Sequence, residues 1–236
     1  MISLTPETNF NNPHQDLQNS LLGKSIAAIV QHYNRAPENP LLLAQNVGKS
    51  RIDTVFDEEF GEQYRGVAAV LDTKNHKLYY RVNALDENNN PVKINKVMYI
   101  STSASNPIPP GKYIFYVPDS VYQFALQNPD KSYFESLEAW GDPSHAVLDP
   151  TFFVAEGKDP VKEMKENHGF LRAVHSIIVP NDPNLSPKTI ETEEKRQLGK
   201  KITSGCIRSQ LEGNREFRNT VIKAKEGGLS TQMFVF

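Results

Sequence analysis

Four short apolar runs separated by turn signals constrain the fold more than any other feature of this sequence. The runs are residues 67–72, 77–82, 96–101 and 112–117, and each contains β-branched or aromatic residues. The segments between them are rich in Asn, Asp, Gly and Pro, which favour turns. This alternation predicts a mainly β fold, either an antiparallel β-sandwich or a partly closed barrel. The first two runs are expected to form a hairpin.

The rest of the chain predicts a continuation of this β scaffold with a few helices. Residues 118–165 carry many loop signals and are a candidate flap over a site. Residues 170–179 predict a strand because of their β-branched content. The polar segment 180–195 holds three prolines and predicts a long surface loop. A short helix over 215–225 and a terminal strand over 229–236 are expected to close the chain.

The first sixty residues differ in character from the β-rich remainder of the chain. Apolar residues recur mostly at spacings of three and four between residues 14 and 35, which predicts an amphipathic helix. We therefore expect an N-terminal helical extension over residues 1–60, whose partner is unassigned, and a β-rich domain over residues 61–236.

Composition argues against two classes of partner. Charged residues make up 23% of the chain and the net charge is −2, which gives no reason to expect nucleic acid or an anionic membrane. No apolar run approaches the roughly 20 residues that cross a bilayer. The N-terminus shows neither the basic nor the apolar region of a secretory signal. An export signal has therefore been removed or never existed.

The chain has one cysteine, Cys206, which lies within the segment Ile202-Thr203-Ser204-Gly205-Cys206-Ile207-Arg208. A lone cysteine is either a buried small hydrophobe or a reactive group, and its neighbours here favour a nucleophile. Gly205 allows close backbone approach, and the amides of 204–206 can point at a developing oxyanion. Arg208 adds a permanent positive charge, on the same face as Cys206 if the segment is extended.

A nucleophilic thiol needs a general base, and histidine is the usual one. His175 is the strongest candidate because it lies in an apolar predicted strand beside Ser176, where a buried imidazole requires polar partners. His168 ranks second, and a structural core histidine is the alternative for His175. One cysteine and the absence of His-x-x-x-His spacing predict no metal site and no cofactor.

The segment 202–208 resembles the active-site signature of the L,D-transpeptidase catalytic domain (YkuD type), and His175-Ser176 fits its upstream histidine element. Weaker similarity extends back through 101–113 to the hairpin, so the resemblance covers about residues 65–236. Two departures stand out. Ser204 occupies a position where this family commonly has histidine, and the interval between His175 and Cys206 is longer than usual.

The resemblance implies acyl transfer on peptidoglycan stem peptides in the periplasm or cell envelope, as an L,D-transpeptidase or an L,D-carboxypeptidase. Cys206 would form a thioester with the stem peptide, His175 would act as base and Ser176 would orient the imidazole. The residues expected at the oxyanion and the substrate are Thr203, Ser204, Gly205, Arg208 and Arg196. The alternative is a catalytically silent relative that binds cell-wall peptides or a protein partner.

Overall fold

A computed structural model describes residues 51–61, 63–85, 91–138, 142–166, 172–182, 184–198 and 205–236. The helix expected over residues 14–35 lies outside these ranges. So do His168, Thr203 and Ser204 among the residues singled out from the sequence.

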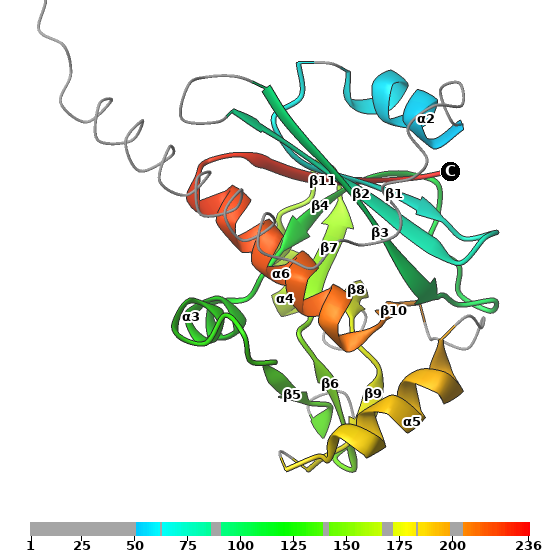
Figure 1. Ribbon diagram of the computed structural model, residues 1–236, viewed down its shortest axis with the longest axis vertical. Coiled ribbons are helices and arrows are strands. Elements are labelled where there is room, and N and C mark those ends of the chain that lie inside the picture. The colour runs from blue at the N-terminus through cyan, green and yellow to red at the C-terminus, as the bar shows by residue number, and fades with distance from the viewer. Residues whose placement is uncertain are drawn as a thin grey trace, which may run out of the picture.

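Eight of the described strands close into one barrel (Figure 1). Their order around it is β1 (Gly66–Asp72), β11 (Ser230–Val235), β4 (Gly111–Tyr116), β7 (Thr151–Ala155), β8 (Arg172–His175), β10 (Ile207–Ser209), β3 (Pro91–Ser101) and β2 (Lys77–Leu85). The predicted mainly β fold is confirmed, as is the hairpin, which is β1–β2. The pairing is mixed rather than purely antiparallel, because β1–β11 and β8–β10 are parallel.

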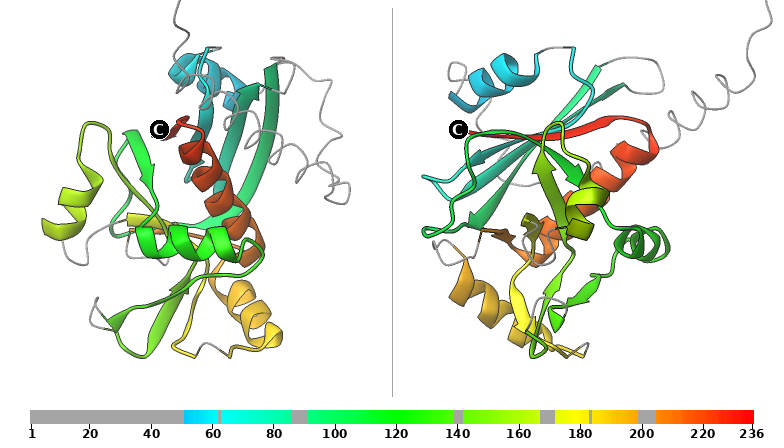
Figure 2. Two further views of the ribbon diagram at one scale, coloured as in Figure 1. Left: turned by 90° about the vertical axis from the view of Figure 1, so that its left-hand side faces the viewer. Right: turned by 180° about the vertical axis from the view of Figure 1, so that it is seen from behind.

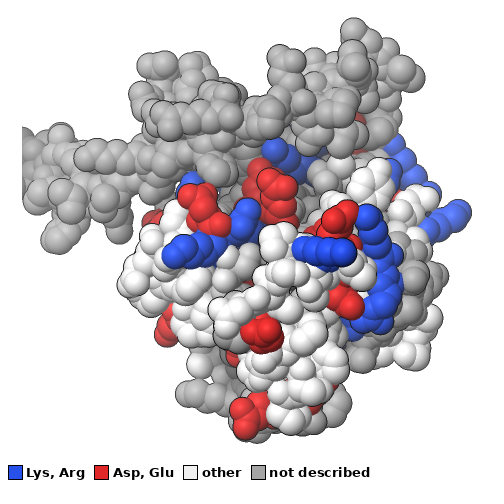
Figure 3. Space-filling model, turned by 60° about the horizontal axis from the view of Figure 1, so that its bottom comes forward, with Lys and Arg blue, Asp and Glu red and all other residues white. Residues whose placement is uncertain are grey.

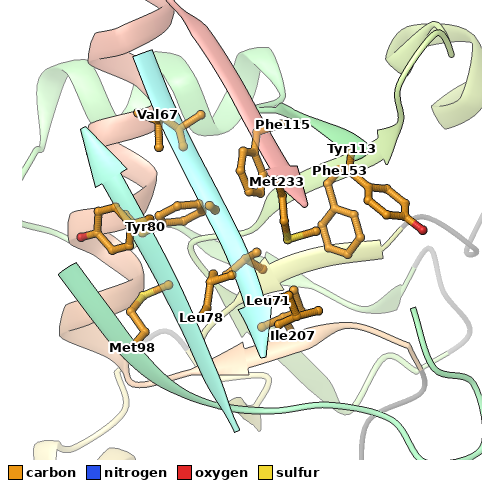
Figure 4. Packing of buried hydrophobic residues seen from close by; sticks show 14 of the residues in the cluster. Val67, Leu71, Leu78, Tyr80, Met98, Tyr113, Phe115, Phe153, Ile207 and Met233 are labelled. Carbon is orange, nitrogen blue, oxygen red and sulfur yellow. The ribbon is translucent and has the colours of Figure 1, made fainter. Parts of the chain in front are cut away.

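Aromatic and aliphatic side chains fill the barrel, and helix α6 (Leu211–Glu226) closes it. Figure 4 shows the packing of Val67, Leu71, Leu78, Tyr80, Met98, Tyr113, Phe115, Phe153, Ile207 and Met233. Phe217 of α6 enters this core and makes edge contacts with the rings of Tyr80 and Phe115, each at 5.1 Å between centroids. Burial of such rings contributes much of the stability of a small β domain.

A three-stranded sheet lies at one end of the barrel, and α2 (Arg51–Phe60) lies on the opposite side of the molecule (Figures 1 and 2). The small sheet contains β5 (Phe134–Ser136), β6 (His145–Leu148) and β9 (Ile178–Pro180). The predicted flap therefore holds two of these strands, together with α3 (Asp119–Gln127), β7 and α4 (Pro160–Glu166). The single strand expected over 170–179 is divided between β8 and β9, which belong to different sheets.

The surface loop predicted for residues 180–195 is wrong in its second half, which forms α5 (Pro187–Gln197). The Ser186 hydroxyl caps the helix by accepting from the Thr189 amide at 3.1 Å. Pro187 occupies the first turn, where a missing N–H costs nothing. The pair Ser186-Pro187 thus begins a helix, although proline suggested a loop.

A fully buried ion pair joins α6 to the turn between β6 and β7. The Arg218 guanidinium donates to the Asp149 carboxylate, and both side chains are inaccessible to solvent. Asp149 also accepts from the Tyr133 amide at 2.6 Å. Because an unpaired charge at such a depth is costly, this pair restricts how the small sheet can lie against the barrel.

Helix α2 packs against the outside of the barrel. Phe56 is buried with Ala68 and Val70 of β1. Arg81 of β2 pairs with Asp53 at 2.7 Å and with Asp57 at 3.3 Å. The last part of the predicted extension thus contacts the barrel.

Acidic and basic side chains are interspersed on the face shown in Figure 3. Within the described residues, no helix combines the length and the apolar character needed to cross a membrane.

Candidate functional site

The parallel pairing of β8 with β10 places two candidate site residues next to each other. Arg208 lies opposite His175, and Ile207 lies opposite Val174. Ile207 and Val174 both belong to the barrel core. Since side chains alternate along a strand, His175 and Arg208 point to the outer side of the barrel.

Cys206 directly precedes β10 and continues the same pattern. By the same register Cys206 lies opposite Ala173, which precedes Val174 on β8. Alternation therefore places the Cys206 side chain at the outer side of the β8–β10 pair, diagonal to His175. The register thus places the thiol, the imidazole and the Arg208 guanidinium on one face of the β8–β10 pair.

His175 is held in one orientation and in the neutral state. It is 3% exposed, and its Nδ1–H donates to the carbonyl oxygen of Ser176. This bond leaves the lone pair on Nε2, as a general base requires. Burial, together with the Arg208 charge, lowers the His175 pKa to about 3. Ser176 is itself fixed, because its amide donates to Leu148 O at 2.9 Å.

The thiol is also neutral at rest. Cys206 is partly exposed, yet burial raises the pKa of its thiol above the ordinary value. The Ala173 amide and the charges of Arg208 and Arg172 oppose this rise without cancelling it. At rest the thiol is therefore protonated and the imidazole is neutral. These are the protonation states from which a cysteine nucleophile and a histidine base can act.

Glycine is required immediately before the cysteine. Gly205 has a φ of +122°, in a region that other residues rarely adopt. A Cβ at this position would lie 3.0 Å from Asn106 Nδ2 and 3.5 Å from Arg172 Nε. Of the amides expected to bind an oxyanion, those of Gly205 and Cys206 are within the described residues.

Gln197, at the end of α5, is a site residue that the sequence did not reveal. It is 1% exposed, and its Oε1 accepts from Arg208 Nη1 at 3.2 Å. The same oxygen accepts from the Ile178 amide at 3.0 Å, and Nε2 donates to Ile178 O at 2.7 Å. Its own carbonyl accepts from Ser101 Oγ at 2.6 Å. The Ser186-Pro187 pair, which is typical of a helix start, is the sequence signal that could have predicted α5 and drawn attention to Gln197.

Helix α5 also explains the long interval between His175 and Cys206. The interval contains β9 and α5, and the end of α5 returns to the barrel through Gln197. A crossover of this kind is needed because β8 and β10 are parallel.

Arg196 is placed differently from the other predicted residues. It is exposed on α5, and its Nε and Nη2 donate to Glu193 Oε2 at 2.8 and 2.6 Å. Burial lowers the pKa of Arg208, and the Arg196 charge adds to this shift. The guanidinium of Arg196 itself contacts Glu193.

Arg172, on β8, is a second residue that the sequence did not suggest. Its charge acts on the Cys206 thiol, and it is partly exposed.

Among the described residues, no group of three or more His, Cys, Asp or Glu side chains could hold a metal ion.

No protein-family model matches the chain, and no curated protein matches it. A solved structure of Bdellovibrio bacteriovorus Bd1075 matches with 12% sequence identity and a TM-score of 0.33. The match covers 74% of this chain and 49% of that chain, so this chain spans about half the length of that protein. Likeness at this level carries no argument about fold family or function.

Proposed function

We propose that this protein is a cysteine acyltransferase acting on peptidoglycan stem peptides, as an L,D-transpeptidase or an L,D-carboxypeptidase. The observation that carries the proposal is the position of Cys206 diagonal to His175 on the outer side of β8–β10. The resemblance of residues 202–208 to the family signature supplies the substrate class, the L,D-transpeptidase type of fold and a site of action in the periplasm or cell envelope.

The first half of the reaction forms a thioester. The Cys206 sulfur attacks the carbonyl between the L-centre of the diamino acid and D-alanine, and His175 Nε2 takes the thiol proton. The amides of Gly205 and Cys206 are suited to donate to the oxyanion. As the C–N bond breaks, His175 returns the proton to the nitrogen, and D-alanine leaves.

The second half releases the acyl group. An amine from another stem peptide, or water, attacks the thioester carbonyl, and His175 accepts the proton of that nucleophile. The C–S bond then breaks and the sulfur regains the proton. Transpeptidation and hydrolysis differ in the acceptor alone, so the same residues serve both reactions.

The neutral resting state of the site agrees with this cycle. A buried imidazole with a pKa of about 3 is unprotonated at neutral pH and can accept a proton. The positive charge of Arg208 lies opposite this imidazole, so the imidazolium is favoured only when the neighbouring sulfur or substrate carries negative charge. Proton transfer is thereby tied to attack on the substrate.

The decisive experiment measures intact mass after exposure to a carbapenem, which enzymes of the resembled family typically accept as an acylating agent. Wild type is expected to gain one adduct and Cys206→Ala none. His175→Ala should lose turnover of stem peptides nearly as completely as Cys206→Ala. His145→Ala is the matched control, because His145 is exposed on β6 and bonded to Asp142 at 2.9 Å.

Other outcomes would change the assignment. A folded wild type that gains no adduct and releases no D-alanine would exclude the enzyme and favour a silent relative that binds wall peptides. A His175→Ala variant that keeps most of its rate would move the base to another histidine. Product analysis on purified stem peptides separates cross-linking from hydrolysis.

A further inference from the structure

One row of side chains crosses three strands on the side of the sheet that carries the thiol. Phe152 of β7 lies opposite Ala173 of β8. In the register of β8 with β10, Cys206 lies opposite Ala173 on the other side. The row therefore runs from Phe152 through Ala173 to Cys206, and the residue in the middle has the smallest side chain.

Strand alternation places this row on the outer side of the barrel. Phe153 and Ile207, the next residues along β7 and β10, belong to the core, where Figure 4 shows their side chains. Since side chains alternate along a strand, Phe152, Ala173 and Cys206 share the opposite side. Neighbouring strands are about 4.8 Å apart, so the backbones of Phe152 and Cys206 are separated by about 10 Å.

Phe152 has cross-strand neighbours of very different size. On the side away from the thiol, Tyr116 of β4 lies opposite it and fills that position with a second ring. On the thiol side lies Ala173, which offers a single methyl group. Ala173 is nevertheless fully buried, and Phe152 is 6% exposed. The ring of Phe152 therefore has more room toward the thiol than away from it.

The thiol lies at the boundary between an apolar and a polar row of this face. The next row along the two strands contains His175 opposite Arg208. The row of the thiol itself continues toward β7 through two apolar side chains, Ala173 and Phe152. A substrate at the sulfur thus meets polar groups on one side and hydrocarbon on the other. An alkyl side chain beside the attacked carbonyl is stabilised on the apolar side, where its surface is removed from water.

We propose that Phe152, across Ala173 from the thiol, contacts the side chain of the terminal residue of the stem peptide and limits its size. This inference rests on the proposed function. The attacked bond joins a diamino acid, which has a long polar side chain, to D-alanine, which has a methyl group. The apolar row suits the methyl group. Phe152 thereby makes the enzyme selective for a small leaving residue.

The test compares stem tetrapeptides that end in D-alanine and in D-leucine, using kcat/KM for release of the terminal residue. Wild type should prefer D-alanine by about tenfold or more, the discrimination expected for extra methylene groups in an apolar pocket. Phe152→Ala should release D-leucine at least as well as D-alanine. Phe60→Ala, which removes an equal ring from α2 that lies 5.1 Å from the Tyr64 ring, should keep the wild-type preference.

Two further variants guard against loss of the fold and reverse the change. Phe152→Leu keeps an apolar side chain at this position, so it should fold and show a preference between those of wild type and Phe152→Ala. Ala173→Val narrows the space between Phe152 and the thiol. It should lower release of D-alanine several-fold and affect a peptide that ends in glycine less.

A second measurement does not require turnover. Cys206 is alkylated with iodoacetamide and with N-benzyl iodoacetamide, which carry the same reactive group and differ in bulk. A change in thiol pKa affects both rates equally, so the ratio of the rates reports the room beside the sulfur. The rate with the benzyl reagent, relative to iodoacetamide, should rise several-fold in Phe152→Ala and stay unchanged in Phe60→Ala.

The outcomes separate this inference from the proposed function. Equal release of D-alanine and D-leucine by wild type, or a preference that survives in both Phe152 variants, overturns the role of Phe152 and leaves the function standing. Absence of turnover by wild type on every stem peptide refutes the function instead. In that case the alkylation ratio alone decides whether Phe152 limits the space at the thiol, and an unchanged ratio rejects it.

Discussion

Arg208 lies directly opposite His175 across the parallel β8–β10 pair, so a permanent cation faces the candidate base. The two groups cannot both be charged at low cost in this buried position. The side-chain acceptor of Arg208 Nη1 is the neutral amide oxygen of Gln197, which leaves the positive charge of Arg208 in place. The imidazole therefore stays unprotonated, and its Nδ1–H bond to the Ser176 carbonyl leaves the lone pair on Nε2.

The first prediction concerns stability against pH. The His175 pKa is about 3 in the folded protein and about 6.5 in the unfolded chain, so between these values the unfolded state binds the additional proton. Stability is therefore lost as pH falls through 6.5, by about 2 kcal/mol between pH 7.5 and pH 5. Urea unfolding of wild type and His175→Asn at both pH values measures this difference.

The asparagine variant is the matched comparison because its side-chain amide can still donate to the Ser176 carbonyl. The other titratable groups are common to both proteins, so their contributions cancel in the difference. Equal acid sensitivity in the two proteins would mean that His175 is protonated in the folded state.

The second prediction concerns the thiol. Because burial raises the pKa of Cys206, the thiolate fraction at neutral pH is below that of an exposed cysteine. The rate of iodoacetamide alkylation should therefore climb steadily with pH and continue to rise past pH 9. A stable thiolate–imidazolium pair would instead give a plateau in the neutral range, and such a plateau would contradict the neutral resting pair.

Much of the scaffold could be predicted from local sequence signals, while the chemistry around the thiol depended on long-range pairing. The hairpin of residues 67–82 was evident because alternation and turn residues are local. The parallel contact of β8 with β10 joins residues more than thirty positions apart, and no local pattern encodes it. Gln197 and Arg172 were missed for this reason. They become neighbours of the site only after α5 and the loop at Asn106 are placed.

The third prediction tests the requirement for glycine before the cysteine. Gly205→Ala adds a Cβ at a φ of +122° and brings it 3.0 Å from Asn106 Nδ2. The backbone strain alone costs about 1–3 kcal/mol. Carbapenem acylation should fall by at least tenfold, because the amides beside Cys206 shift. Gly157→Ala, also at positive φ but with open space around it, is the control for strain away from the site. Equal acylation by the two variants would show that the backbone at Gly205 has no special role.

The fourth prediction concerns Gln197 as the link between α5 and the site. Gln197→Ala removes the acceptor of Arg208 Nη1 and both side-chain bonds to the Ile178 backbone. Unpaired buried polar groups of this kind cost about 1–3 kcal/mol. The value of kcat should fall by more than the loss of folded protein accounts for, because Arg208 is then no longer held relative to His175. The measurement is kcat on stem peptides at a temperature where the variant is fully folded.

Lys195→Gln is the control on the same helix, since Lys195 makes an exposed i,i+4 pair with Glu191 at 2.5 Å. An exposed pair of this kind contributes little to stability, so its loss should leave both stability and turnover nearly unchanged. If Gln197→Ala is destabilised but keeps the wild-type kcat and pH profile, Gln197 fastens α5 to the barrel and has no part in positioning Arg208. A lowered kcat together with a shift in the acidic limb of the pH–rate profile would instead show that the hydrogen bond from Arg208 to Gln197 influences the protonation of His175.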